Sequence, residues 1–227
     1  MKKRTTLRSA FTLLLAMMTI MVMALPKQFE GIITYKITYP GSTFTEAQMA
    51  MFPKIMTITI KGQKTISEIQ TQMGSQIEIT NYETKTKTQL INMMGQKYAI
   101  PQTNEEIQEE VKDQPEGEVK ITDETKTIAG ITCKKAIVTV NDDGTKITYD
   151  VWFSEEFGAE NPNFDNPIYK NINGVMMEFS MITPQFTMKF TAISVDKKKI
   201  PNKTFDIPAD YTITTMEELR SKMGGMR

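Results

Sequence analysis

The chain has 227 residues, of which 40% are apolar and 24% are charged, and this is the composition of an ordinary globular protein. Its 27 basic and 27 acidic residues give a formal net charge of zero, so it lacks the positive field that nucleic-acid binding requires. It has no histidine and one cysteine, which excludes His-dependent catalytic triads, His-based zinc sites and an intramolecular disulfide.

The first 24 residues predict a cleavable signal peptide. Residues 2–4 are Lys-Lys-Arg, and the uncharged apolar run 11–25 follows, which is typical of secretory leaders. Ala24 fits a cleavage site, and no cysteine follows that could carry a lipid. An uncleaved anchor is the alternative, although a membrane span usually needs about 20 residues. We therefore expect residues 25–227 to be one domain in the periplasm or otherwise outside the cytoplasm, not lipidated, and soluble after cleavage.

From residue 29 onward, apolar and polar residues alternate with a period of two, which is typical of half-buried antiparallel strands. Residues 30–39, 55–60 and 75–80 follow this pattern, as do 134–140, 145–153, 174–182 and 185–195. A cluster of turn-forming residues, Asn141-Asp142-Asp143-Gly144, lies between two of these runs and predicts a tight hairpin. Residues 158–167, rich in Asn and Pro, predict a long loop.

Helix signals are few. Thr103 and Thr215 are each followed three residues later by a glutamate, the spacing of a capping box, so each should begin a short helix. A sheet with one aromatic and aliphatic face and one Thr/Lys/Glu face closes into a barrel, packs on a second sheet, or curls around a few helices. The short helices favour the last form. We expect a mainly β (α+β) fold, a strongly curved antiparallel half barrel with a few short helices covering its concave face.

Methionine is unusually frequent, with 18 residues and clusters at 49–51, 93–94 and 176–177. Thioethers suit copper(I), and they also suit a deformable apolar cavity or simple core filling. Core filling is the default, since no histidine is present to assist a copper site. No metal or other cofactor is predicted.

Paired acids raise the alternative of glycoside hydrolysis, which needs two carboxylates facing one cleft. Glu155-Glu156, beside Trp152-Phe153, is the pair closest to that pattern, whereas the pairs at 105–106, 109–110 and 217–218 fit exposed helix faces. The run 141–144 lacks the distal glutamate of a calcium loop. Cys133 fits a small buried hydrophobe, and the lysine run 197–199 fits a solvated turn or weak contact with membrane headgroups. No enzyme is predicted.

Several short sequence motifs resemble those of a known protein family. They are FEGIITY at 29–35, IAGITCKK at 128–135, DVWFS at 150–154, GVMME at 174–178 and FDIPA at 205–209 with Tyr211. With these motifs the chain resembles the DUF4412 type of exported Bacteroidetes protein, similar in fold to lipoprotein carriers and insertases of the LolA/LolB kind. The resemblance implies a strongly curved antiparallel sheet whose concave side is plugged by helices. In the carriers this apolar cavity receives the acyl chains of lipoproteins, and no catalytic motif is implied.

The leading hypothesis is a non-enzymatic extracytoplasmic protein that holds an acyl chain, a lipid or another apolar ligand, with transient membrane contact and no nucleic-acid partner. The face proposed to bind it, which is equally explained as core, is Tyr35, Ile37, Tyr149, Phe179, Phe186 and Phe190. The alternative is a structural or protein-interaction module of the cell envelope, with a filled core and no ligand. It would show an exposed apolar patch or sheet edge instead of a cavity.

Overall fold

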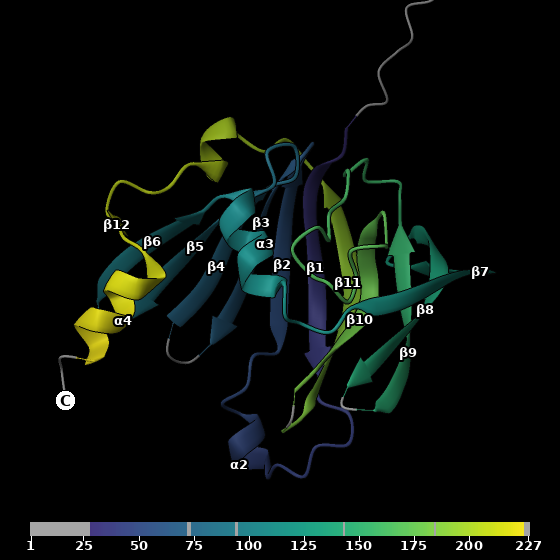
Figure 1. Ribbon diagram of the computed structural model, residues 1–227. Coiled ribbons are helices and arrows are strands. Elements are labelled where there is room, and N and C mark those ends of the chain that lie inside the picture. The colour runs from purple at the N-terminus through teal and green to yellow at the C-terminus, as the bar shows by residue number, and fades with distance from the viewer. Residues whose placement is uncertain (1–27, 72–73, 94, 143, 184, 225–227) are drawn as a thin grey trace, which may run out of the picture.

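A computed structural model describes residues 28–71, 74–93, 95–142, 144–183 and 185–224. Its main feature is one open sheet of 12 strands in the order β12-β6-β5-β4-β3-β2-β1-β11-β10-β9-β8-β7 (Figure 1). The strands are β1 (Glu30–Thr38), β2 (Ile55–Lys61), β3 (Lys64–Thr71), β4 (Gly74–Asn81), β5 (Thr86–Met93), β6 (Gln96–Gln102), β7 (Gly117–Ile128), β8 (Ile131–Asp142), β9 (Thr145–Ser154), β10 (Val175–Ile182), β11 (Thr187–Lys197) and β12 (Thr212–Ile213). Within the described residues the helices are α2 (Glu46–Met49), α3 (Asn104–Val111) and α4 (Met216–Gly224), with a 3-10 turn η1 (Asn202–Phe205). The predicted signal peptide, residues 1–24, lies outside the described residues.

The chain starts in the middle of the sheet and builds it outward in two halves. It runs from β1 to β6, crosses to the far edge at β7, and returns strand by strand to β11, which pairs with β1. All the strand pairs are antiparallel except β12 with β6, which is parallel. The prediction of a mainly β, antiparallel fold is confirmed. None of the helices in the described residues is long and apolar enough to span a membrane.

Local signals place several elements where the sequence predicts them. β8 ends at Asp142 and β9 begins at Thr145, so the hairpin at 141–144 is confirmed. Thr103 caps α3 through a reciprocal capping box with Glu106. The hydroxyl of Thr215 accepts a hydrogen bond from the backbone N–H of Glu218 (3.1 Å) at the start of α4. The short helix α2, also capped by a threonine, was not predicted.

One face of the sheet carries the main core, and we call it the inner face. On β1 it is defined by Ile33, Tyr35 and Ile37, whose side chains are at most 3% exposed. The register puts Met56 of β2 opposite Tyr35, and Phe190 of β11 opposite Ile37, so their side chains lie on the same face. The core continues from these strands across β8, β9 and β10. Burial of this face is the principal source of stability.

The inner face becomes polar across the strands β3, β4 and β5. Two rows of paired residues cross from β2 to β5: Ile60, Thr65, Thr80 and Lys87 in one, and Ile58, Ser67, Glu78 and Gln89 in the other. On these strands most apolar residues lie on the opposite face, where Leu90 of β5 and Ala99 of β6 are buried, whereas Ile69 and Ile91 lie on the inner face. The segment 205–207, which begins at the last residue of η1, lies there beside Ile79 on the opposite face. In this half of the sheet residues are therefore buried on both faces, because Ile100 of β6, paired with Gln89, is 2% exposed on the inner face.

A long loop between β9 and β10, residues 155–174, lies over the inner face, and we call it the cover loop. It contributes Phe157, Tyr169 and Ile172 to the main core. A Cβ on Gly117 of β7 would lie 2.0 Å from the carbonyl oxygen of Ile168, so only glycine allows this close approach. The predicted loop at 158–167 is confirmed as part of this segment. Figure 1 shows α3 in front of β3 and β4, and its residue Gln108 donates a hydrogen bond to the Phe164 carbonyl (3.3 Å).

Candidate functional site

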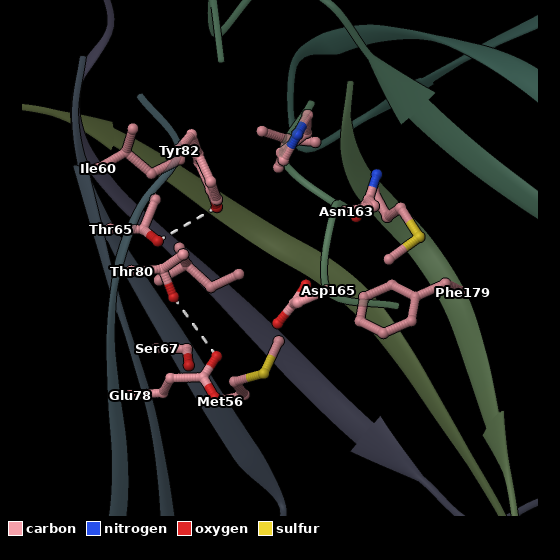
Figure 2. Close-up of a pocket in the computed structure, with 14 residues that line it drawn as sticks. Met56, Ile60, Thr65, Ser67, Glu78, Thr80, Tyr82, Asn163, Asp165 and Phe179 are labelled. Atoms are coloured by element: carbon pink, nitrogen blue, oxygen red, sulfur yellow. Dashed lines mark hydrogen bonds between the residues drawn. The ribbon is translucent and has the colours of Figure 1, made fainter. Parts of the chain in front are cut away.

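A half-open pocket of about 190 Å³ lies on the inner face beneath the cover loop (Figure 2). Strands β2, β3 and β4 form one side of it and β10 forms another. Between β2 and β10 the sheet contains β1 and β11, so the pocket bridges strands that are not neighbours. The pocket has one apolar wall and one polar wall.

The apolar wall comes from β2 and β10. Its members are Met56, Ile58, Ile60, Val175, Met176 and Phe179. The ring of Phe179 is stacked on that of Phe190, with ring centres 4.8 Å apart and an angle of 5° between the planes. The ring of Tyr35 contacts Phe179 edge-on at 6.2 Å. Because aromatic contacts hold Phe179 from two sides, this wall has a fixed shape.

The polar wall comes from β3, β4, the turn after β4 and the cover loop. Its members are Thr65, Ser67, Glu78, Thr80, Tyr82 and Asp165. Behind it, Nζ of Lys87 lies 3.1 Å from Oδ2 of Asp165 and 3.5 Å from Oε2 of Glu78. The hydroxyl of Thr80 donates a long hydrogen bond (3.5 Å) to the other oxygen of Glu78. The exposed fractions of the Lys87, Asp165 and Glu78 side chains are 12%, 21% and 32%, so this charge cluster is only partly solvated.

Burial and the neighbouring charges alter the ionisation of this wall. Burial raises the pKa of the Glu78 carboxyl; Asp165 adds to the rise and Lys87 opposes it. Burial alone would lower the pKa of Lys87, but attraction by Glu78 and Asp165, with the hydrogen bond to Asp165, raises it overall. Burial raises the pKa of Tyr82 to about 12, although a hydrogen bond from the Thr65 hydroxyl (3.2 Å) opposes the rise. Lys87 and Tyr82 therefore keep their protons at neutral pH.

The cover loop is pinned so that Asp165 faces the sheet. The side-chain amide of the buried Asn163 donates hydrogen bonds to the carbonyls of Ile172 (2.7 Å) and Gly174 (3.2 Å). On the sheet side, the ring of Phe164 meets that of Tyr82 edge-on at 6.5 Å. The Lys87–Asp165 ion pair closes the loop over β5. These contacts make the pocket a preformed feature of the fold.

The six aromatic and aliphatic residues proposed from the sequence do not form one open surface. Tyr35, Ile37, Phe179 and Phe190 are buried in the main core, whereas Tyr149 and Phe186 are half-buried against it. Of the six, only Phe179 lines the pocket. The prediction that the β1, β10 and β11 residues of this set lie on the same face of the sheet is correct. Most of that face is covered by other side chains of the core.

Phe186 instead belongs to an aromatic cluster at one end of the sheet. Its ring lies 5.2 to 5.8 Å from the rings of Phe52, Phe44 and Tyr39, which flank α2. Beside this cluster lie four exposed apolar side chains that we call the apolar end: Met51 (64% exposed), Ile55 (42%), Met181 (44%) and Ile182 (46%). Figure 1 shows α2 next to the end of the β10–β11 hairpin. This end is a second candidate for an interaction.

The other chemical candidates lie apart from the pocket. Glu155 is exposed and paired with Lys134 (3.1 Å), while Glu156 accepts a hydrogen bond from the Thr132 backbone (3.3 Å), so the two acids do not face a common cleft. Cys133 is fully buried, and its pKa is raised to about 11 by that burial, as expected of a core thiol. The described residues contain no group of three or more acidic or cysteine side chains placed to hold a metal ion.

The charged residues of the pocket were missed because they are far apart in the sequence. Glu78 stands in a strand whose isoleucines suggested that its polar residues face solvent. Instead Glu78 and Thr80 are on the inner face, and Thr80 is 6% exposed. Lys87 and Asp165 occur in segments with no motif. Only the register of β4 with β5 and the path of the cover loop bring these three charged groups together.

Comparison with known proteins identifies the family. The search of curated proteins found no match. The model of one family, described as a domain of unknown function (DUF4412), matches residues 29–164. This match spans β1 to β9 and the first part of the cover loop, and includes Glu78 and Lys87. Because it covers more than half of the 227 residues, the chain belongs to the DUF4412 family.

Proposed function

We propose that the protein is an exported, non-enzymatic binding protein that holds one small ligand with an apolar body in the pocket under the cover loop. The observation that supports this most directly is the pocket itself, which has a volume of about 190 Å³ and in which the apolar wall faces the polar wall with its two carboxylates. Ligand sites are typically apolar concavities with a few convergent polar groups. The basic and apolar leader at residues 1–25 is the support for export.

The volume of the pocket limits the size of the ligand. An apolar cavity of about 150 Å³ holds one benzene molecule, and drug-sized ligands occupy about 300 Å³ or more. A pocket of about 190 Å³ therefore suits a single ring or a short alkyl group. The acyl chains of a lipoprotein would need the cover loop to leave the inner face, which the Lys87–Asp165 pair opposes.

A curved half barrel of the LolA/LolB kind remains part of this proposal. It is supported by the pocket, because β10 and β4 can line the same space only if the sheet between them bends. It is also supported by α3 and the cover loop, which contact each other through Gln108 and Phe164. Like the plugs that the resemblance implies, they leave only a small part of the inner face open.

A pocket-filling variant tests the proposed function. Ser67 lines the pocket, whereas Ser194 is exposed on β11. Small ring compounds and short-chain alcohols and amines are titrated by NMR against the parent, Ser67→Phe and Ser194→Phe. We expect binding to the parent and to Ser194→Phe, and loss of binding in Ser67→Phe. A parent that binds none of the compounds, or a Ser67→Phe variant that binds them equally well, contradicts the proposal.

The apolar end favours a second candidate, an interaction module that rests on an anionic lipid surface. Four of the seven large apolar side chains that are exposed in the described residues lie there. Lys36 stands opposite Ile55 in the strand register, and Lys54 precedes it. Both lysines are exposed, and neither has an ion pair with a described residue. Apolar side chains flanked by unpaired lysines suit anionic headgroups.

Sedimentation with phospholipid vesicles tests this second candidate. The double variant Ile55→Ser/Ile182→Ser should lose binding to vesicles that contain phosphatidylglycerol. The matched control is Ile121→Ser/Ile193→Ser, since both of these isoleucines are 52% exposed elsewhere on the sheet. Equal binding of the two double variants, or no binding of the parent, refutes a lipid-facing role for the apolar end.

A further inference from the structure

We propose that the pocket selects ligands that carry a protonated amine next to a small apolar body. This inference rests on the proposed function, because it names the ligand class for the same pocket. It follows from which charges face the cavity and which do not.

The charge cluster is unbalanced toward the negative side. Glu78 and Asp165 share a single partner, the ammonium of Lys87, at 3.5 and 3.1 Å. With both acids ionised, the cluster carries one excess negative charge. In a partly desolvated site that charge is less screened than on the surface, so a cation placed there is favoured.

The arrangement presents the carboxylates, and not the ammonium, to the ligand. Glu78 and Asp165 line the pocket, whereas Lys87 reaches them from β5 and does not line it. None of the described lysines or arginines lines this pocket. Figure 2 shows Asp165 projecting between the two walls, with Glu78 beside Ser67 on the sheet. An anionic group would meet like charge here, whereas an ammonium would meet two acceptors.

Hydrogen-bond acceptors for an ammonium are available on the polar wall. Oδ2 of Asp165 accepts from Lys87, and no described residue donates a hydrogen bond to Oδ1. The hydroxyls of Ser67 and Thr65 line the same wall and can also accept. An ammonium has three donors, which matches this set of oxygens. The ring of Phe179 and the β2 isoleucines lie across the pocket, where the apolar body would pack.

Three ligands of matched size test the charge preference: benzylamine, which is protonated at pH 7, benzyl alcohol and benzoate. Each is titrated by NMR against the protein as recovered after export by a bacterial host. We expect benzylamine to bind about tenfold more tightly than benzyl alcohol, the scale of a charge-assisted hydrogen bond in a partly exposed site. Benzoate should bind more weakly than the alcohol.

Two variants locate the preference. Asp165→Asn and Glu78→Gln should each bring the affinities for amine and alcohol close together, with benzyl alcohol still bound. Asp210→Asn, an exposed acid paired with Lys97, is the control and should keep the full preference. Equal affinities for amine and alcohol in the parent, or a preference unchanged in both pocket variants, overturns the inference and leaves the proposed function standing. If none of the three compounds binds, both fail.

Discussion

The ion pair between Lys87 and Asp165 should contribute more to stability than a surface pair of the same length. Replacing Lys87 by methionine keeps most of the length of the side chain and leaves two partly buried carboxylates without their shared cation. Breaking a fully buried pair costs about 3–5 kcal/mol. Because Asp165 and Glu78 are 21% and 32% exposed, we expect solvent to reduce this loss to about 2 kcal/mol.

Lys134 and Glu155 provide a control of matched geometry. Their N–O distance is also 3.1 Å, but each side chain is 52% exposed, so Lys134→Met should cost at most about 0.5 kcal/mol. Guanidinium denaturation followed by the fluorescence of Trp152, the single tryptophan, measures both losses. Adding Asp165→Asn to Lys87→Met should recover about 1 kcal/mol, because it removes one of the unpaired charges. Equal losses for the two lysine variants would refute the assignment of a partly buried charge cluster.

Three further results are expected from the same structure. The pKa of Glu78 is raised above its ordinary value of 4.5, so the folded state binds this proton more tightly and loses stability as pH rises from 4.5 to the folded-state pKa. The stability of Glu78→Gln relative to the parent should therefore increase from pH 4.5 upward. A difference in unfolding free energy that does not change with pH contradicts this. Gly117→Ala should lower the free energy of unfolding by about 2–3 kcal/mol, because its Cβ would lie 2.0 Å from the Ile168 carbonyl oxygen. An unchanged free energy of unfolding would show that the cover loop is not held against β7. Intact mass after export should correspond to a chain beginning at Leu25, and a mass that retains the leader supports the uncleaved anchor.

The sequence predicted the strands whose two faces differ strongly. β1, β2 and β8 to β11 alternate apolar residues with Thr, Lys or Glu, so their period is clear, and a turn of Asn and Asp residues marks the β8–β9 hairpin. β3, β5, β6, β7 and β12 were not predicted. In β5, TKTQLINM, the adjacent Leu90 and Ile91 point to opposite faces, so no alternation of apolar and polar residues marks the strand. Strand formation there depends on partners rather than on local pattern.

The candidate site was harder to predict from the sequence than the fold was. Alternation identified a buried face through Tyr35, Ile37, Phe179 and Phe190, but it could not show which part of that face is left uncovered. That depends on the cover loop, whose path is fixed by tertiary contacts such as the Asn163 amide bonds. The charge cluster joins Glu78, Lys87 and Asp165 from three segments of the chain. In each segment the sequence makes the charged residue look like an ordinary solvated side chain.

The high methionine content allows a direct test of where a ligand binds. Met56 and Met176 line the pocket, whereas Met51 and Met181 are exposed at the apolar end. In protein labelled with ¹³C at the methionine methyl groups, and assigned by single Met→Leu replacements, benzyl alcohol, whose binding does not depend on a charge preference, should shift the Met56 and Met176 signals in a saturable manner. The Met51 and Met181 signals should stay in place. Saturable shifts confined to Met51 and Met181, or no shift at Met56 and Met176 at any concentration, would contradict a ligand site under the cover loop.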